Sequence, residues 1–324
     1  MATLQDVYRP VRKEMEDVER IIAASLSEGT VPELRKINRA LRASPGKRLR
    51  PAMVLLSAHA GAYRRRKDGR GRRESIAKTA AAVELIHVST LVHDDVMDAS
   101  LLRHRKPTVN ALHGDNVAIC AGDYLLARAF MLLAETGNPA LIGIASRAVK
   151  DVCEGQVLQV WRRGKAMGLK EYDAIIDRKT AALFRAACGM GACAAGLEGS
   201  ALPFFGFHFG RGFQMIDDYL DIVSDEKTLG KRPGENIRQG EWTLPALLLL
   251  QQVPKASRAS TAERCMEDMR LLRRMIAMRH VGESVWKAVN EEMRKAEQAL
   301  DSLPASPCRQ ALHQLLDLSV SRLK

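Results

Sequence analysis

Proline spacing constrains the fold of this chain more than any other feature of its sequence. Three long stretches, 52–106, 140–202 and 255–303, contain no proline. A proline inside a helix costs about 3 kcal/mol, because it lacks the backbone N–H and its ring clashes with the preceding turn. Each of the three stretches can therefore form long helices.

The apolar residues in these stretches recur every three or four positions, as they do on one face of a helix. Val83, Ile86 and Leu91 fall on one such stripe, and Ile175 and Leu183 fall on another. Alternating patterns typical of strands are scarce. The sequence therefore predicts one all-α domain over 1–324, with ten or more helices and no internal linker.

Local signals predict where some of these helices begin and where loops lie. Ser260 and Glu263 have the spacing of a capping box, which predicts a late helix over about 263–278. Seven of the ten residues in 64–73 are arginine or lysine. This basic run predicts a solvated, flexible loop between two helices, and contact with a phosphate or a lipid headgroup is the alternative.

The composition excludes several classes of protein. Of the 324 residues, 46% are hydrophobic and 27% are charged, which supplies a sizeable core and excludes wholesale disorder. No uninterrupted apolar run approaches the roughly 18 residues of a membrane span, and no secretory signal is evident. The six cysteines form no CxxC pair and predict reduced thiols rather than a zinc site. We therefore expect a cytoplasmic protein.

The net charge of +12 suits a polyanionic partner. Such a partner could be nucleic acid, an anionic membrane surface or a phosphorylated small molecule. The basic run at 64–73 has no interleaved aromatic residues, which single-stranded nucleic acid would need for stacking. We therefore expect no nucleic-acid partner.

Two acidic clusters are the main candidates for chemistry, at 94–98 (DDVMD) and 217–221 (DDYLD). In each cluster the first and last aspartates are four residues apart and so lie on one face of a helix. Like charges at this spacing repel, and apolar neighbours raise the cost of ionisation. A divalent cation would offset both costs, and hard carboxylate oxygens suit Mg²⁺.

One cluster alone would be explained better as a solvated acidic face. Two copies, each inside an apolar helix, favour paired metal clusters that face each other across a cavity. This arrangement suits a diphosphate leaving group, since metals neutralise the charge that develops as a C–O bond breaks. Basic residues that could bind the remaining phosphate charge are Lys47, Arg48, Arg50, Arg103, Arg105, Lys179 and Lys231.

With these residues identified, the sequence resembles the trans-type polyprenyl diphosphate synthases, most of all the long-chain, octaprenyl-type enzymes. The resemblance implies the isoprenoid synthase fold, a bundle of mostly antiparallel helices around a deep central cavity. The matching motifs cover essentially the whole chain: GKRLRP (46–51), ELIHVSTLVHDDVMD (84–98), PTVN (107–110), AGDYLL (121–126), EGQVLQ (154–159), KTAALF (179–184), FQMIDDYLDIV (213–223), LGK (229–231) and TLP (243–245).

The resemblance implies a role for each matching residue. Bound Mg²⁺ would be held by Asp94, Asp95, Asp98, Asp217, Asp218 and Asp221. The allylic diphosphate would contact Arg103, Lys179, Thr180, Gln214 and Lys231. Isopentenyl diphosphate would contact Lys47, Arg50, His87 and position 104. Asp94, Asp98, Asp217 and Lys179 would be the catalytic residues.

The implied reaction joins isopentenyl diphosphate to an allylic diphosphate, farnesyl or geranylgeranyl diphosphate, and each cycle adds five carbons. The allylic C–O bond ionises, the isopentenyl double bond attacks the cation, and a proton is lost to the released diphosphate. The resemblance also implies a homodimer. A transient contact with a membrane surface would serve product release.

Three positions depart from the family pattern. His104 stands where the family usually has an arginine, Glu241 stands where it has a lysine, and Asn236 stands where it has an aspartate. Arg105 would substitute for the missing arginine only if a shift of one residue kept its direction, and in a helix that shift rotates a side chain by about 100°. Weak isopentenyl diphosphate binding, or a role as one subunit of a heteromer, are both open.

The residues before the first acidic motif bear on product length. The product would grow along the helix that carries Asp94, towards its N-terminus. Short-chain members of the family typically have Phe or Tyr four or five residues before this motif, whereas here Ser89 and Thr90 are small. The sequence therefore predicts a product longer than geranylgeranyl diphosphate.

Two alternatives remain at this stage. A class I terpene cyclase also uses an aspartate-rich motif, but its second helix usually carries an Asn/Ser/Glu triad, which 217–221 lacks. The other alternative is a non-catalytic or regulatory subunit of a heteromeric prenyl diphosphate synthase. Both acidic motifs are intact, which favours catalysis.

Overall fold

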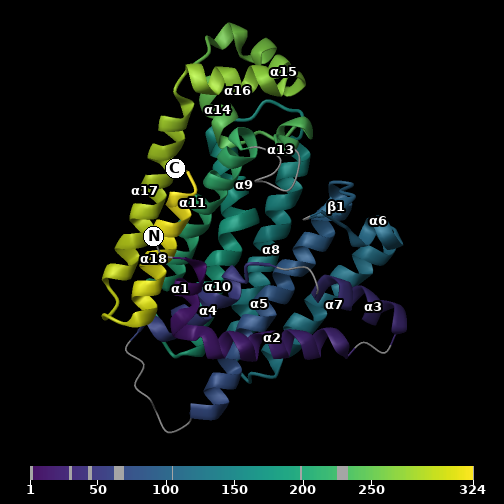
Figure 1. The fold of residues 1–324 in the computed structure, drawn as a ribbon, viewed down its shortest axis with the longest axis vertical. Helices are drawn as coiled ribbons and strands as arrows, with labels where there is room; N and C mark the ends of the chain where they lie inside the picture. The colour runs from purple at the N-terminus through teal and green to yellow at the C-terminus, as the bar shows by residue number, and fades with distance from the viewer. Residues whose placement is uncertain are drawn as a thin grey trace.

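The structure is a computed structural model. It describes residues 3–28, 31–42, 46–61, 69–103, 105–197, 199–224 and 233–323. These residues fold into a bundle of helices, most of them aligned with the long axis of the molecule (Figure 1). The all-α prediction of ten or more helices is confirmed.

The first half of the chain supplies most of the lower part of the bundle in Figure 1. Its elements are α1 (Leu4–Tyr8), η1 (Arg9–Val11), α2 (Arg12–Ser27), α3 (Pro32–Arg42), α4 (Leu49–Ala60), α5 (Gly69–Met97), β1 (Leu102–Arg103), β2 (Lys106–Pro107), α6 (Val109–His113), α7 (Asp115–Ala134) and α8 (Pro139–Arg162). The two short strands pair antiparallel just after α5.

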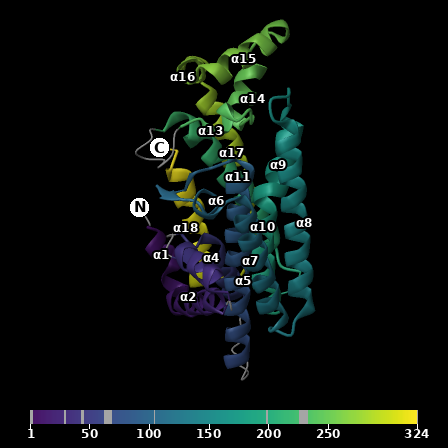
Figure 2. The ribbon, with the colours of Figure 1, turned by 90° about the vertical axis from the view of Figure 1, so that its right-hand side faces the viewer.

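The second half of the chain contributes the remaining helices. They are α9 (Leu169–Ile176), η2 (Asp177–Ala181), α10 (Ala182–Ala194), α11 (Leu202–Val223), α13 (Glu235–Arg238), α14 (Leu244–Gln251), η3 (Lys255–Ser257), α15 (Arg258–Glu267), α16 (Met269–Met278), α17 (Val281–Asp301) and α18 (Pro307–Ser321). Figure 2 places α8 and α9 at one edge of the molecule and α1 and α18 at the opposite edge.

Helix α10 is the centre of the bundle, since it contacts α4, α5, α8 and α11. A glycine permits the closest of these approaches: a Cβ at Gly191 would lie 2.2 Å from the carbonyl oxygen of Val54 in α4. Most of the remaining α10 side chains are small or apolar and are buried. The core therefore extends outward from α10, and α5 and α11, which carry the two acidic motifs, both pack against this helix.

Two local predictions were wrong in part. Residues 69–73 of the predicted basic loop belong to the first turns of α5, and 64–68 lie outside the described residues. Arginine is a good helix former, and extending an existing helix costs far less than starting one. The predicted late helix is two helices, because the Asp268 side chain accepts bonds from Arg270 N and Leu271 N and begins α16 there.

Two helical stretches of the described residues, 71–97 and 115–134, are long and apolar enough to span a membrane by length and composition alone. In the first stretch, 67% of the apolar window is buried inside the structure, as expected of a core helix. In the second, within α7, only 44% of the window is buried. Helix α7 therefore presents apolar side chains at the surface.

Candidate active site

A cleft with two lobes lies between α5 and the helices α8, α10 and α11. The first lobe has a volume of about 320 Å³ and the second about 660 Å³. Six residues line both lobes, so the lobes are parts of one cleft: Leu91, Asp94, Arg103, Lys179, Thr180 and Gln214. Most of the polar residues singled out in the sequence therefore meet in one place.

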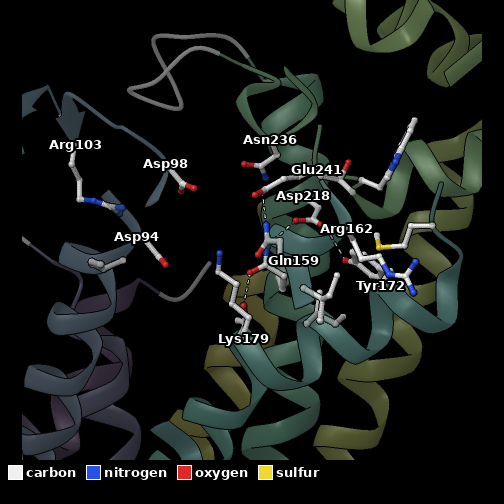
Figure 3. A pocket seen from close by; sticks show the side chains of 18 residues that line it. Asp94, Asp98, Arg103, Gln159, Arg162, Tyr172, Lys179, Asp218, Asn236 and Glu241 are labelled. Atoms are coloured by element: carbon white, nitrogen blue, oxygen red, sulfur yellow. Dashed lines mark hydrogen bonds between the residues drawn. The ribbon is translucent and has the colours of Figure 1, made fainter. Parts of the chain in front are cut away.

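Figure 3 shows the first lobe from close by. Asp94 and Asp98 come from α5 and the residue that follows it, and they face Asp218 and Asn236 across the cavity. The Lys179 side chain points into the space between these two walls. The first acidic motif and part of the second therefore lie on opposite walls of the lobe, as the sequence predicted.

Asp94 lies in the wall formed by α5 and lines both lobes. Burial raises the pKa of Asp94 above its usual value, and the like charges of Asp98 and Asp95 raise it further. Lys179 and Arg103 lower the pKa and so oppose this effect. A carboxylate in such surroundings gains from a bound cation, because the cation offsets both the burial and the repulsion.

The turn that carries Lys179 and Thr180 departs from regular α-helix. Residues Asp177–Ala181 form a π-helical turn between α9 and α10. Helix α8 approaches it closely, since a Cβ at Gly155 would lie 2.6 Å from the backbone nitrogen of Lys179. Thr180 Oγ1 donates to Gln214 Oε1 at 2.8 Å, which connects this turn to α11. Both side chains thereby reach the cleft from a packed support.

The first two aspartates of the second motif, Asp217 and Asp218, have different surroundings. Asp217 lines the second lobe and pairs with Arg322 of the C-terminal region, with Nη2 2.7 Å from Oδ1. Asp218 lines the first lobe, is 4% exposed, and accepts bonds from Tyr172 Oη at 2.7 Å and Gln214 Nε2 at 2.8 Å. Burial raises the pKa of Asp218 to about 7, although these hydrogen bonds lower it.

The second lobe contains the predicted cationic pocket. Arg50 Nη1 donates to His87 Nε2 at 3.0 Å, and the guanidinium carbon lies 4.2 Å from the centre of the Phe184 ring. Burial lowers the pKa of Arg50 to about 10, and burial followed by the charge of Arg50 lowers the pKa of His87 well below 6.5. His87 is therefore neutral here and can accept the arginine N–H.

Arg48 supports the loop that carries Lys47 and Arg50. Its Nη1 lies 2.8 Å from Glu84 Oε1 of α5, and its Nε lies 2.6 Å from Glu19 Oε1 of α2. Arg48 also adopts a left-handed backbone conformation, with a φ of 51°. The loop is therefore held between two helices, while Lys47 and Arg50 line the second lobe.

Of four further predicted residues, two are not described by the structure, and the other two line neither lobe. His104 and Lys231 lie outside the described residues. Asp221 is 2% exposed, one turn after Asp217 on α11, and lines neither lobe. Ser89 is also buried and lines neither lobe, whereas Thr90 lines the second.

Other lining residues were not predicted as site residues, although Asn236 and Glu241 were noted as departures from the family pattern. Gln159, Tyr172, Asn236 and Glu241 line the first lobe, and Arg322 lines the second. Gln159 is the last residue of the EGQVLQ motif, so this motif could have identified it as a residue of the cleft. Tyr172 and Arg322 carried no such signal, because their proximity to the aspartates of α11 arises only from the packing of distant helices.

The donor set fits a hard divalent cation shared with an anion. Within the described ranges, no three acidic, histidine or cysteine side chains come close enough to hold a metal by themselves. Asp94 and Asp98 lie one turn apart on one wall, and Asp217 projects from α11. A cation between the walls would therefore complete its shell with oxygens from a phosphate group and water, which suits Mg²⁺.

Comparison with known proteins shows which family has this architecture. The sequence profile described as Polyprenyl synthetase matches residues 31–277. The chain belongs to the polyprenyl synthetase family.

Relatives of this polyprenyl synthetase match it over most of their length. An all-trans-nonaprenyl-diphosphate synthase (geranyl-diphosphate specific) of Rhodobacter capsulatus is 34% identical, over 99% of this chain and 98% of the relative. An octaprenyl diphosphate synthase of Escherichia coli (strain K12) is 35% identical, over 86% of each. A crystal structure of a Caulobacter crescentus CB15 polyprenyl synthase, complexed with calcium and isoprenyl diphosphate, superimposes with a TM-score of 0.90. The two chains are 34% identical, and the match covers 99% of this chain and 98% of the other.

The chain is therefore a prenyltransferase of isoprenoid biosynthesis, a polyprenyl diphosphate synthase. The predicted resemblance and the predicted fold are confirmed. The family assignment also decides against the class I terpene cyclase alternative.

Proposed function

We propose that this polyprenyl diphosphate synthase condenses isopentenyl diphosphate head to tail with an allylic diphosphate, that the reaction depends on Mg²⁺, and that the all-trans product is longer than C20. The observation that carries the proposal is the cleft with two lobes. One lobe combines carboxylates with Lys179, and the other contains Arg50 and neutral His87. Two diphosphate groups could therefore bind side by side.

Asp94 lines both lobes, Asp98 lines the first and Asp217 lines the second, so these three would hold Mg²⁺ where the lobes meet. Asp95, Asp218 and Asp221 would support them. Bound Mg²⁺ would neutralise the negative charge that grows on the diphosphate as the allylic C–O bond breaks.

The cations of the first lobe act on the same leaving group. Lys179 and Arg103 would bind its phosphate oxygens, with the Thr180–Gln214 pair fixing their surroundings. Because these groups are in place before the bond breaks, they stabilise the developing charge without reorganising. Lys231, by its place in the LGK motif, would add to this set.

In the second lobe, Lys47 and Arg50 would bind the diphosphate of isopentenyl diphosphate. Neutral His87 orients the Arg50 guanidinium by accepting one of its N–H groups. The double bond of the bound isopentenyl group would then attack the allylic cation and form the new C–C bond. The proton lost from the isopentenyl group would pass to the released diphosphate.

Product length is the second part of the proposal. Thr90, Leu91, Val152 and Leu183 line the second lobe on the side of α5, α8 and α10, and no aromatic side chain occurs in 74–123. One turn further along α8, Ala148 is small and buried. A growing chain that passes along α5 would therefore meet no aromatic side chain of that helix, which supports a product longer than C20.

We further propose that two copies pair through α7 and α8. Trp161 and Val157 of α8 are 71% and 64% exposed, and they lie four residues apart on one face of the helix. Met131 of α7 is 51% exposed. Large apolar side chains exposed on neighbouring helices are typical of a surface covered by a partner. A second copy of this chain would cover both helices.

The remaining expectations stay predictions: a cytoplasmic location, transient contact with a membrane surface during product release, and catalysis by this chain rather than regulation of a partner subunit. Both acidic motifs contribute to the cleft, which supports catalysis.

One assay tests the proposal directly. The purified protein is incubated with Mg²⁺, farnesyl diphosphate and labelled isopentenyl diphosphate, and the dephosphorylated products are sized. We expect a ladder that extends past C20 and disappears when EDTA removes the metal. A ladder that ends at C20 would contradict the proposed length, and the absence of any labelled product would contradict the proposed reaction.

A further inference from the structure

One acid of the first lobe is not explained by the proposed function. Glu241 lines this lobe and is only 8% exposed. It stands where the resembling family has a lysine. A buried carboxylate beside a diphosphate site would repel the substrate, and leaving it without a partner would cost several kcal/mol. The site therefore requires a cation close to Glu241.

Arg163 provides this cation. Its Nε donates to Glu241 Oε1 at 2.7 Å, and its Nη2 lies 2.6 Å from the same oxygen. Gln159 donates to the other carboxylate oxygen of Glu241. The Arg163 Nη2 group also binds Asp98, so the arginine connects Glu241 to the first acidic motif.

The backbones that carry this pair are fixed to each other. Gly164 N donates to the carbonyl oxygen of Gly240 at 2.9 Å, and Trp242 Nε1 donates to the carbonyl oxygen of Lys165 at 2.9 Å. Gly240 has a φ of +78°, and a Cβ there would lie 2.8 Å from Gly164 N. The turn after α8 and the turn before α14 therefore form one rigid support beneath Arg163.

If the Arg163–Glu241 pair served only to join these two turns, Arg163 would not need to contact Asp98, the residue that follows α5. The backbone contacts already join the turns, yet Arg163 extends to Asp98, which Figure 3 shows across the cavity from Glu241. Asp98 is one of the carboxylates proposed to hold Mg²⁺. A metal and a guanidinium would compete for its oxygens, so metal binding would release one partner of Arg163.

We propose that Arg163 is a further diphosphate-binding residue of this chain, held beside the first lobe by Glu241 and transferred from Asp98 to the diphosphate when a metal takes up Asp98. The inference rests on the proposed function of the lobe. After the transfer, Nε remains bound to Glu241 while Nη2 faces the anion. The planar guanidinium suits this double role, because its donors point in fixed directions and pair well with phosphate oxygens.

Titration calorimetry tests the inference without turnover. Inorganic diphosphate is titrated in the presence of Mg²⁺ into the wild type, Arg163→Met, Arg163→Lys and the double variant Arg163→Met/Glu241→Gln. Arg185→Met is a matched control, because Arg185 also forms an ion pair between two helices, with Asp151 at 2.8 Å, but its partner lines neither lobe, whereas Asp98 and Glu241 line the first. Circular dichroism verifies that each variant is folded.

We expect Arg163→Met to weaken diphosphate binding by at least about tenfold, since it removes a charged donor and leaves the negative charge of Glu241 without a counter-ion. Arg163→Lys keeps the charge and should lose less. The double variant should recover part of the loss, because it removes the uncompensated acid. The control should bind as the wild type does. Binding of Mg²⁺ alone should not weaken in Arg163→Met, whereas a collapsed site would lose metal and diphosphate together.

Two outcomes separate the inference from the function on which it rests. Wild-type diphosphate affinity in Arg163→Met would overturn the role of Arg163 and leave the proposed function standing. A wild type that binds no diphosphate in the presence of Mg²⁺ would contradict the proposed function itself. An equal loss in Arg163→Lys and Arg163→Met would contradict the charge compensation.

Discussion

Arg103 binds the Asp95 carboxylate through two nitrogens. Its Nε lies 3.0 and 3.1 Å from the two carboxylate oxygens, and its Nη2 lies 2.9 Å from Oδ1. Such a fork between arginine and carboxylate fixes the orientation of both groups. Asp95 therefore positions Arg103 at the cleft, while Asp94 and Asp98 of the same motif face the first lobe.

This division predicts how variants of the pair behave. Asp95→Asn, Arg103→Met and the double variant should each lower kcat/KM for the allylic substrate by a similar factor, about 10- to 100-fold. The first change removes the group that orients Arg103, and the second removes its charge, so each one abolishes the same oriented cation. Steady-state kinetics over the double-mutant cycle measures this. Losses that multiply in the double variant would show that the two residues act independently.

Thr90 should control product length. It lines the second lobe four residues before Asp94. Thr90→Tyr places a large side chain where the growing chain would pass and should shorten the product ladder, while Thr90→Val, of nearly the same size, should leave it unchanged. Chromatography of the dephosphorylated products reads out both variants. An unshortened ladder in Thr90→Tyr would mean that the chain grows along another path.

Neutral His87 should make stability depend on pH. Burial, and then Arg50, lowers the pKa of His87 in the folded protein, while in the unfolded chain it stays near 6.5. Between these two pKa values the unfolded chain binds the proton and the folded chain does not. This contribution to stability is therefore complete above about pH 6.5 and is lost as the pH falls towards the folded-state pKa, by up to about 1.4 kcal/mol per pH unit.

Denaturant unfolding of the wild type and His87→Gln from pH 7.5 to pH 5 measures this contribution. The wild type should lose stability relative to the variant as the pH falls through this range. A difference between the two proteins that stays constant with pH would show that His87 titrates normally.

The proposed dimer depends on the exposed face of α8. Trp161→Glu should shift the protein from dimer to monomer, because it places a charge in the centre of an apolar surface. Light scattering after size-exclusion chromatography gives the mass. Lys170→Glu, on α9, changes the charge in the same direction without removing an apolar side chain, and it should remain dimeric. A wild type that is monomeric throughout would contradict the proposed interface.

Much of the fold follows from local sequence. The proline-free stretches contain α5, α10 and α17 and all of α8 after its first residue, Pro139, and the two acidic motifs lie at the predicted helical spacing. These features depend on residues three or four positions apart, so the sequence alone identifies them. The resemblance to the family predicted which of these residues meet in the cleft. A family motif carries information about contacts between distant segments, whereas local spacing does not.

Other features depend on contacts between distant segments and had no local pattern. The π-helical turn at 177–181 forms where Gly155 of α8 allows close approach, and Arg211 of α11 binds both Asp173 and Asp177 beside it. The Arg163–Glu241 pair joins residues 78 positions apart. In the sequence Glu241 was only a departure from the family pattern, and its partner became visible only in the folded chain.

The central claim is that the acidic motifs of α5 and α11 act together on one diphosphate through shared Mg²⁺. Turnover of Asp94→Asn, Asp217→Asn and the double variant tests it most directly. Each single variant should lose at least about 100-fold in kcat while remaining folded, and the double variant should be little worse than either one, as expected of residues that act as a unit. Wild-type turnover in either single variant, or losses that multiply in the double variant, would contradict the claim.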